Sequence, residues 1–124
     1  MAQIYRLETA AGTVIADHVE VADTIWSRFM GLMFRRELPT GHGLAIRPCN
    51  SIHMFFMRFA LDVVFVDGEG RVLRILDSIR PWRASSLVRG AKAAIELPAG
   101  TAARAALGRG TVVRLVDAAS ASGR

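Results

Sequence analysis

The stretch 48–65, PCNSIHMFFMRFALDVVF, contains the side chains most able to do chemistry. Cys49, Ser51 and His53 come at alternate positions, directly before an almost wholly apolar run. If this stretch is extended, alternate side chains point to the same face. A thiol, a hydroxyl and an imidazole would then meet at the edge of a hydrophobic segment, as in the wall of a small-molecule pocket.

Two charged residues interrupt the apolar run. Asp62 lies between Leu61 and Val63, so an inward-facing carboxylate there must be paired or have a raised pKa. Arg58, four residues earlier, is its candidate partner. Arginine also suggests an anionic or carboxylate-bearing ligand, because its forked guanidinium matches a carboxylate. The predicted ligand-binding residues are Cys49, Ser51, His53, Arg58 and Asp62.

The same residues leave an enzymatic alternative open. A cysteine hydrolase or thiol-transfer enzyme needs Cys49 as a thiolate, with His53 as base and Asp62 as the nearest carboxylate. Four strand steps would separate Cys49 from His53 by ~13 Å, so they meet only if the segment turns. A small buried cysteine is common in protein cores. The preferred interpretation is therefore a non-enzymatic binding or accessory module that needs no cofactor.

A copper site is a further alternative. Cys49, His53 and Met57 imitate the ligand order of a blue-copper loop, and soft sulfur with imidazole suits copper. His42 or His18 would supply the second histidine. Against this alternative, copper loops join two strands, whereas 51–57 is itself predicted to be a strand.

The loop RPWR provides a candidate anion-binding surface. Trp82 could stack on a base or a sugar while Arg80 and Arg83 hold phosphate. The alternative interpretation is a tryptophan that covers one end of the fold, with its arginines in water. The sequence contains no RNA-recognition, KH or zinc signature, so nucleic-acid binding is an alternative and not the leading function.

Short strands joined by tight turns must position these residues. Asp67-Gly68-Glu69-Gly70 is a hairpin turn, and Pro98 with Gly100 ends a strand that propensity alone would allow as helix. About seven strands are expected among eight strand-like stretches. The strand-like stretches are 3–9, 13–21, 44–46, 51–57, 61–67, 71–76, 91–97 and 111–117.

Two short helices complete the predicted elements. Asp23 or Thr24 can cap the first helix, and Gly31 weakens its end. Thr101 can cap a second helix over 102–107. Because the strands come in hairpins, the predicted fold is mainly β (α+β): a compact antiparallel β-barrel or rolled sheet with two short helices.

Size and composition set the class of protein. The 124 residues predict one domain over 1–117 and a frayed tail over 118–124. The net charge is +5, carried almost entirely by scattered arginines. No run reaches the ~18 apolar residues of a membrane span, and a single cysteine cannot form an internal disulfide. We therefore expect a cytoplasmic protein without a membrane partner.

Four ordered blocks resemble a known family. The blocks are RFMGLMFRREL (28–38), PCNSIHMFFMRFALDVVFVDGEGRV (48–72), RGAKAAIELPAG (89–100) and LGRGTVVRL (107–115). They resemble the Gly-Leu-Met, central, Glu-Leu-x-x-Gly and closing Gly-x-Gly blocks of the domain of unknown function 192 family. The likeness covers roughly 20–115 and implies a β-rich single domain.

The central block is similar to the branch with Cys, Ser, Ile and His before Phe-Met-Arg-Phe. That branch commonly has Thr after the His and Pro before the Leu- or Ile-Asp pair, where this chain has Met54 and Ala60. Met54 in place of threonine removes one hydroxyl from any site in this segment. The resemblance carries over neither a catalytic residue nor a cofactor.

Overall fold

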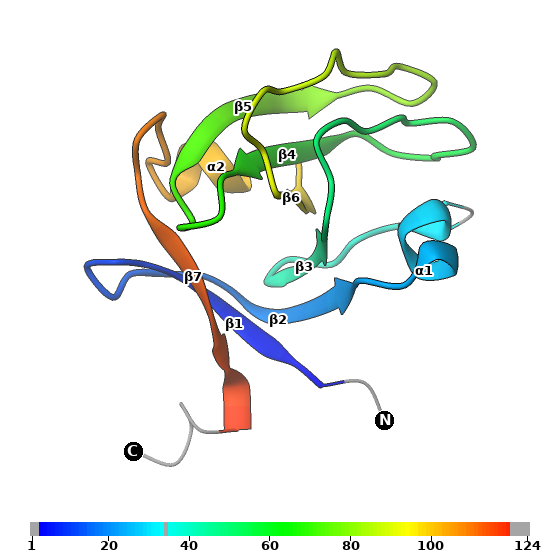
Figure 1. The fold of residues 1–124 in the computed structure, drawn as a ribbon. Helices are drawn as coiled ribbons and strands as arrows, with labels where there is room; N and C mark the ends of the chain where they lie inside the picture. Colours follow the sequence, from blue (N-terminus) through cyan, green and yellow to red (C-terminus); the bar gives the residue numbers. More distant parts are fainter. Residues whose placement is uncertain (1–2, 34, 120–124) are drawn as a thin grey trace.

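The computed structural model describes residues 3–33 and 35–119, which form one seven-stranded sheet. The strand order is β5-β4-β6-β3-β2-β1-β7 (Figure 1). The predicted mainly β fold is therefore confirmed. The strands are β1 (Tyr5–Thr9), β2 (Val14–Ala22), β3 (His42–Ile46), β4 (Leu61–Val66), β5 (Val72–Ile79), β6 (Ala93–Pro98) and β7 (Val113–Asp117), and the helices are α1 (Ile25–Met30) and α2 (Thr101–Arg104).

The sheet is mixed and rolls back on itself. Among the described strands only β2 and β3 pair in parallel, and α1 lies in the crossover between them. The edge strands approach each other where they begin: Val72 N donates to Thr111 O at 2.8 Å and Val113 N to Gly70 O at 2.9 Å. Gly70 has φ +82°, and a Cβ there would collide with the Val113 carbonyl, so only glycine allows this approach. The result is a rolled sheet that is not fully closed.

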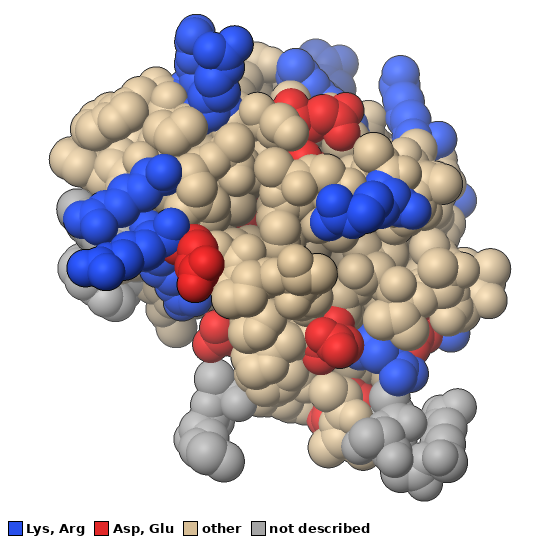
Figure 2. Space-filling view, turned by 180° about the vertical axis from the view of Figure 1, so that it is seen from behind, with Lys and Arg blue, Asp and Glu red and all other residues tan. Residues whose placement is uncertain are grey.

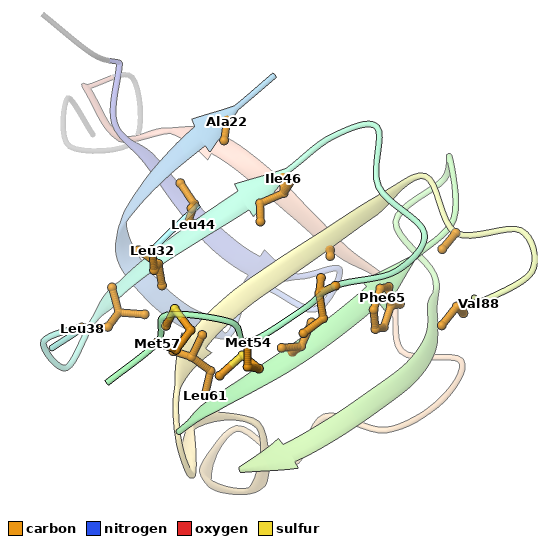
Figure 3. Packing of buried hydrophobic residues seen from close by; sticks show 14 residues of the cluster. Ala22, Leu32, Leu38, Leu44, Ile46, Met54, Met57, Leu61, Phe65 and Val88 are labelled. Atoms are coloured by element: carbon orange, nitrogen blue, oxygen red, sulfur yellow. The ribbon is translucent and has the colours of Figure 1, made fainter. Parts of the chain in front are cut away.

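The rolled sheet buries apolar side chains on both faces. Along β4, Leu61, Val63 and Phe65 pack on the outer face, while Val64 and Val66 point into the roll. Figure 3 shows the outer cluster, in which residues of the loops and of the segment after α1 cover the sheet. Burial on both faces explains why β4 is an unbroken apolar run apart from Asp62.

Helix α1 begins at a capping box and ends at a glycine. The Thr24 side chain accepts from Ser27 N at 3.0 Å, and Ser27 Oγ accepts from Thr24 N at 3.0 Å, which forms a capping box. Gly31, with φ +47°, follows the last helical residue and donates to Ser27 O at 2.9 Å. Of the two predicted caps, Asp23 and Thr24, the structure uses Thr24, and the helix ends at Gly31, the residue that was expected to weaken its end.

The predicted strand over 51–57 is wrong. Apart from an isolated bridge between His53 and Ala84, the segment is irregular, and it hydrogen-bonds to the loop after β5. Ser85 N donates to Ile52 O at 2.9 Å, and Trp82 N donates to Met54 O at 2.7 Å. The apolar residues of the segment pack onto the outer face of the sheet without adding a strand to it. The apolar residues of 51–57 are therefore explained by their burial against the sheet, and not by the alternating pattern of a strand.

Helix α2 is also capped differently from the prediction. Thr101 lies inside the first turn, and Gly100 is the N-cap without a side chain to accept. Asp62 from β4 takes that role: one carboxylate oxygen, Oδ2, accepts from Gly100 N at 3.0 Å and Ala102 N at 2.9 Å. A carboxylate from a neighbouring strand thus satisfies the free amides of the helix.

Candidate functional site

A small polar pocket lies on the outer face of the sheet, between α1 and the irregular segment 47–60. Its volume is about 60 Å³. The sheet provides its floor, α1 and the residues after it one wall, and the irregular segment the other. Its lining residues are Arg28, Met30, Gly31, Leu32, Met33, Ile46, Cys49, Ser51, Ile52, His53, Met57 and Glu96. Three of the five predicted ligand-binding residues, Cys49, Ser51 and His53, therefore lie on one pocket.

Glu96 is the most unusual group in this polar pocket. It projects from β6, is only 4% exposed, and its Oε1 has no hydrogen-bond partner in the described part of the chain. Burial raises the pKa of Glu96 to about 7, against a weaker lowering effect of Arg35. Glu96 therefore exchanges a proton near neutral pH, and its protonated form can donate a hydrogen bond.

Arg28 supplies a second unsatisfied atom to the polar pocket. One terminal nitrogen of its guanidinium donates to Pro48 O at 2.9 Å, which ties α1 to the irregular segment. Its Nε is buried and, within the described residues, has no acceptor. Glu96 and Arg28 thus offer a proton-dependent donor and a fixed donor to the same small space.

Cys49 lies half-buried in the polar pocket as a thiol. Its Sγ donates to Ser51 O at 3.0 Å. Burial raises the pKa of the Cys49 thiol, and the nearby Glu96 charge adds to that effect. These surroundings favour the protonated thiol, whereas a nucleophilic cysteine needs the thiolate.

His53 is held by its own loop. Its Nδ1 accepts from Phe55 N at 3.3 Å, so the other ring nitrogen, Nε2, carries the proton of the neutral ring. The ring also lies 5.0 Å, centroid to centroid, from Phe55. His53 is therefore positioned as a wall of the polar pocket, oriented by the backbone.

Asp62 and Arg58 do not line the polar pocket. Asp62 is 0% exposed, and its register opposite Leu97 places it on the inner face of the sheet. Its Oδ1 accepts from Ser78 N at 2.9 Å, and its Oδ2 from the two amides at the start of α2. Arg58 is exposed. The expected Arg58–Asp62 pairing is thus replaced by backbone amides, because these reach the carboxylate in the interior.

The histidines proposed as further copper ligands lie elsewhere. His18 and His42 are opposite each other on β2 and β3, and their rings stack at 4.2 Å between centroids. Neither lines the polar pocket that contains Cys49, His53 and Met57. Within residues 3–33 and 35–119, no group of three or more His, Cys, Asp or Glu side chains could hold a metal ion.

The Trp82 loop forms a separate, exposed surface. Trp82 is 59% exposed, and its ring lies 6.1 Å from Phe55 and 5.0 Å from Phe56, so three rings gather outside the core. Arg80 and Arg83 are exposed beside it. On the face shown in Figure 2, basic side chains form separate groups with acidic side chains between some of them.

Sequence reasoning missed Glu96 and Arg28, although a signal for Glu96 was present. It is the one carboxylate in the strand AAIELP, whose four central residues are all buried. A charge at such a position needs an explanation. Arg28 gave no comparable signal, because its burial depends on how α1 sits against Pro48.

Comparison with known proteins agrees with the fold. The family model DUF192, described as Uncharacterized ACR, matches residues 6–115, and the chain belongs to this family. A UPF0127 protein of Pyrococcus furiosus is 37% identical over 101 residues, which cover 76% of this chain and 83% of that protein. A UPF0127 protein of Thermococcus sibiricus is 40% identical over 95 residues, which cover 72% of this chain; the chain spans only 60% of that relative's length.

Two solved structures are similar along most of the chain. A protein of unknown function from Novosphingobium aromaticivorans has a TM-score of 0.77 and 26% identity, with coverage of 90% of this chain and 83% of that chain. A protein from Sinorhizobium meliloti, described as a putative transcription regulator, has a TM-score of 0.75 and 25% identity, with coverage of 93% and 94%. Among the described residues, no helix is long and apolar enough to cross a membrane.

Proposed function

We propose that this protein is a non-enzymatic, cytoplasmic binding module whose polar pocket takes the carboxylate end of a small ligand. One observation carries the proposal: Glu96 and Arg28 line the same pocket, and within the described residues the buried Oε1 of Glu96 and the buried Nε of Arg28 have no hydrogen-bond partner. Each unsatisfied buried atom costs roughly 1–3 kcal/mol. A ligand that supplies both partners recovers that free energy on binding.

The size of the polar pocket limits what enters it. A volume of about 60 Å³ equals the share of roughly two water molecules in the liquid. A carboxylate group is of this size and accepts from both Arg28 and protonated Glu96. Ser51 is exposed and His53 is half-buried, so the rest of the ligand leaves the pocket on their side.

Binding of a carboxylate must be linked to the protonation of Glu96. The ionised side chain repels a carboxylate, whereas the protonated one donates to it. With a pKa of about 7, the affinity at pH 8.5 is expected to be about 30-fold lower than at pH 5.5. A primary carboxamide, which is neutral and can both donate and accept, would not follow this dependence.

The test is an NMR titration of the amides with acetate as the probe. At pH 5.5 acetate should shift the amides of Gly31 and Cys49, and at pH 8.5 it should bind about 30-fold more weakly. Glu96→Gln keeps a donor without a titratable group, so its affinity for acetate should be equal at both pH values. Glu37→Gln, an exposed carboxylate outside the pocket, should retain the wild-type dependence. Pocket amides that do not shift at pH 5.5 would refute the proposal.

Association with single-stranded nucleic acid is a second candidate function. It is supported by the exposed ring of Trp82 beside Phe55 and Phe56, with Arg80 and Arg83 in the same loop. Aromatic stacking and phosphate contacts would predict quenching of Trp82 fluorescence by oligo-dT, weakened by salt. Trp82→Phe should remove the quenched signal, and Arg80→Gln with Arg83→Gln should reduce the salt dependence. Unchanged emission would exclude this role.

A further inference from the structure

A second cavity opens from the inside of the rolled sheet. It has a volume of about 370 Å³ and lies where the β4–β5 turn meets β1, β3, β6 and β7. We call it the roll cavity. Its position is distinct from the polar pocket: Ala45 and Ile95 line the roll cavity, while the next residues of the same strands, Ile46 and Glu96, line the polar pocket. Because side chains alternate across a sheet, the two cavities lie on opposite faces.

The floor of the roll cavity is apolar. It is built from aliphatic strand residues of both halves of the roll, namely Leu7, Ala45, Val66, Ile95, Val113 and Leu115. These side chains provide no hydrogen-bonding group, so the buried part of an occupant must itself be apolar. At about 30 Å³ per water, the volume equals roughly twelve waters, which suits a body of about ten non-hydrogen atoms.

The acidic groups near the mouth of the roll cavity are already engaged. Asp67 Oδ1 accepts from Glu69 N and Arg71 N, both at 2.9 Å, and so belongs to the turn. Glu69 lies 3.8 Å from the Arg71 guanidinium. The hydrogen bonds lower the pKa of Asp67, so this carboxylate remains charged, but within the described residues neither it nor Glu69 forms an ion pair with Arg47 or Lys92.

The basic groups at the same mouth are less balanced. Arg114 lies 3.8 Å from Glu8, a buried carboxylate that also pairs with Arg6. Arg47 and Lys92 line the mouth and are exposed, and no carboxylate of the described chain pairs with either. The mouth therefore has two cations available for an anion.

We propose that the roll cavity binds an amphipathic anion. An apolar chain or ring of about ten non-hydrogen atoms lies against the aliphatic floor, and a carboxylate, sulfate or phosphate head lies at Arg47 and Lys92. Burial of the apolar body provides most of the affinity. The two cations select an anionic head group over a neutral or cationic one. They add little to the affinity, because ion pairs at an exposed position are weak.

Amide NMR titrations with three eight-carbon probes test this proposal. Octanoate and octyl sulfate should shift the amide resonances of Gly68, Gly70 and Ala93. The difference in affinity between the two probes shows whether a carboxylate or a sulfate head is preferred. Octanol should bind about tenfold more weakly than either. The double variant Arg47→Gln, Lys92→Gln should lower octanoate affinity about tenfold and leave octanol unchanged. Arg36→Gln with Arg89→Gln removes the same charge outside the cavity and should have no effect.

The two proposed sites can fail separately. Octanoate carries the carboxylate that the polar pocket takes, so its titration is repeated on the wild type at pH 8.5, where binding at the polar pocket is about 30-fold weaker and the shifts at Gly68 and Gly70 should persist. Two results would overturn the roll-cavity proposal. One is that neither octanoate nor octyl sulfate shifts the amides of Gly68 and Gly70. The other is that octanoate binds the wild type and the Arg47→Gln, Lys92→Gln double variant with equal affinity. Neither result bears on acetate binding at Gly31 and Cys49.

Discussion

Asp62 and Glu96 are buried carboxylates on neighbouring strands, and they differ in what surrounds them. Asp62 receives three backbone N–H groups, from Ser78, Gly100 and Ala102. Glu96 has an oxygen without a partner in the described residues and a pKa raised to about 7. A satisfied buried carboxylate stabilises the fold, whereas the unsatisfied one lines the pocket at which we propose that a ligand binds.

The register of the sheet explains this difference. Asp62 lies opposite Leu97 and faces the interior of the roll, where the start of α2 offers free amides. Glu96 lies opposite Val63 and faces the outer side, below Gly31. One step along paired strands therefore separates a structural carboxylate from a candidate functional one.

The largest effect is expected from removing the satisfied carboxylate. Asp62→Ala leaves three backbone donors without their acceptor in the interior, so it should lower the free energy of unfolding by about 3–5 kcal/mol. Urea unfolding followed by circular dichroism measures this change. Asp77→Ala, an exposed aspartate on β5, is the control and should change stability little. A loss below about 1 kcal/mol for Asp62→Ala would mean that water replaces the carboxylate.

The unsatisfied carboxylate should show the opposite behaviour. The pKa of Glu96 is raised in the folded protein, so the folded state retains a proton that the unfolded state releases above pH 4.5. The contribution of Glu96 to the free energy of unfolding is therefore fully present below pH 4.5. It is lost as the pH rises to about 7, which lowers the free energy of unfolding by about 3 kcal/mol. Glu96→Gln should abolish this fall and be up to about 3 kcal/mol more stable than wild type at pH 8.

Glu8→Gln is the matched control for that variant. Glu8 is also a buried strand carboxylate, 6% exposed, but it pairs with Arg6 at 2.6 Å and lies 3.8 Å from Arg114. Its replacement should destabilise the protein at pH 8, because it leaves two guanidinium groups without their partner. If both variants were destabilised equally at pH 8, the contrast between paired and unpaired carboxylates would be lost. Urea unfolding at pH 4 and pH 8 decides this.

A smaller effect is expected from filling the polar pocket. A Cβ at Gly31 would lie 3.8 Å from Glu96 Oε1 and 3.8 Å from Ile46 Cδ1, which is ordinary contact, but the residue has φ +47° and ψ −126°. Gly31→Ala should therefore cost roughly 1–3 kcal/mol through backbone strain. It should also weaken acetate binding at pH 5.5, measured by the same amide titration. Normal acetate affinity in a folded Gly31→Ala protein would place the ligand outside the polar pocket.

The smallest effect concerns the helix that covers the pocket. Thr24→Ala removes the capping box of α1 and should cost about 1 kcal/mol. Thr24→Ser retains the hydroxyl and should stay near wild type. Because α1 carries Arg28, the alanine variant should also bind acetate slightly more weakly. Hydrogen exchange at the amides of Ser27 and Arg28 would report the loosened helix, and unchanged protection there would show that tertiary packing alone holds it.

Local patterns predicted much of the fold. The hairpin at 67–70, the strand ended by Pro98 and the helix cap at Thr24 each follow from a few neighbouring residues, and the structure confirms them. The segment 51–57 was predicted wrongly, because its apolar residues are buried by tertiary packing on an existing sheet. No local signal distinguishes that burial from strand formation.

The site was predictable only in part, for the same physical reason. Cys49, Ser51 and His53 are neighbours in the sequence and share one pocket in the structure. The assignment of Asp62 depended on which face of β4 it occupies, and this is set by pairing with β6. Glu96 and Arg28 reach the polar pocket from separate elements, so their meeting depends on topology that the sequence pattern does not encode.

The most direct test of the central claim is a ¹³C NMR titration of the Glu96 side-chain carboxyl, with and without acetate. We expect an apparent pKa near 7 in the free protein and a higher value with acetate bound, since the protonated side chain is the form that binds. A pKa near 4.5 that acetate does not move would contradict the account, because Glu96 would then be an ordinary solvated carboxylate.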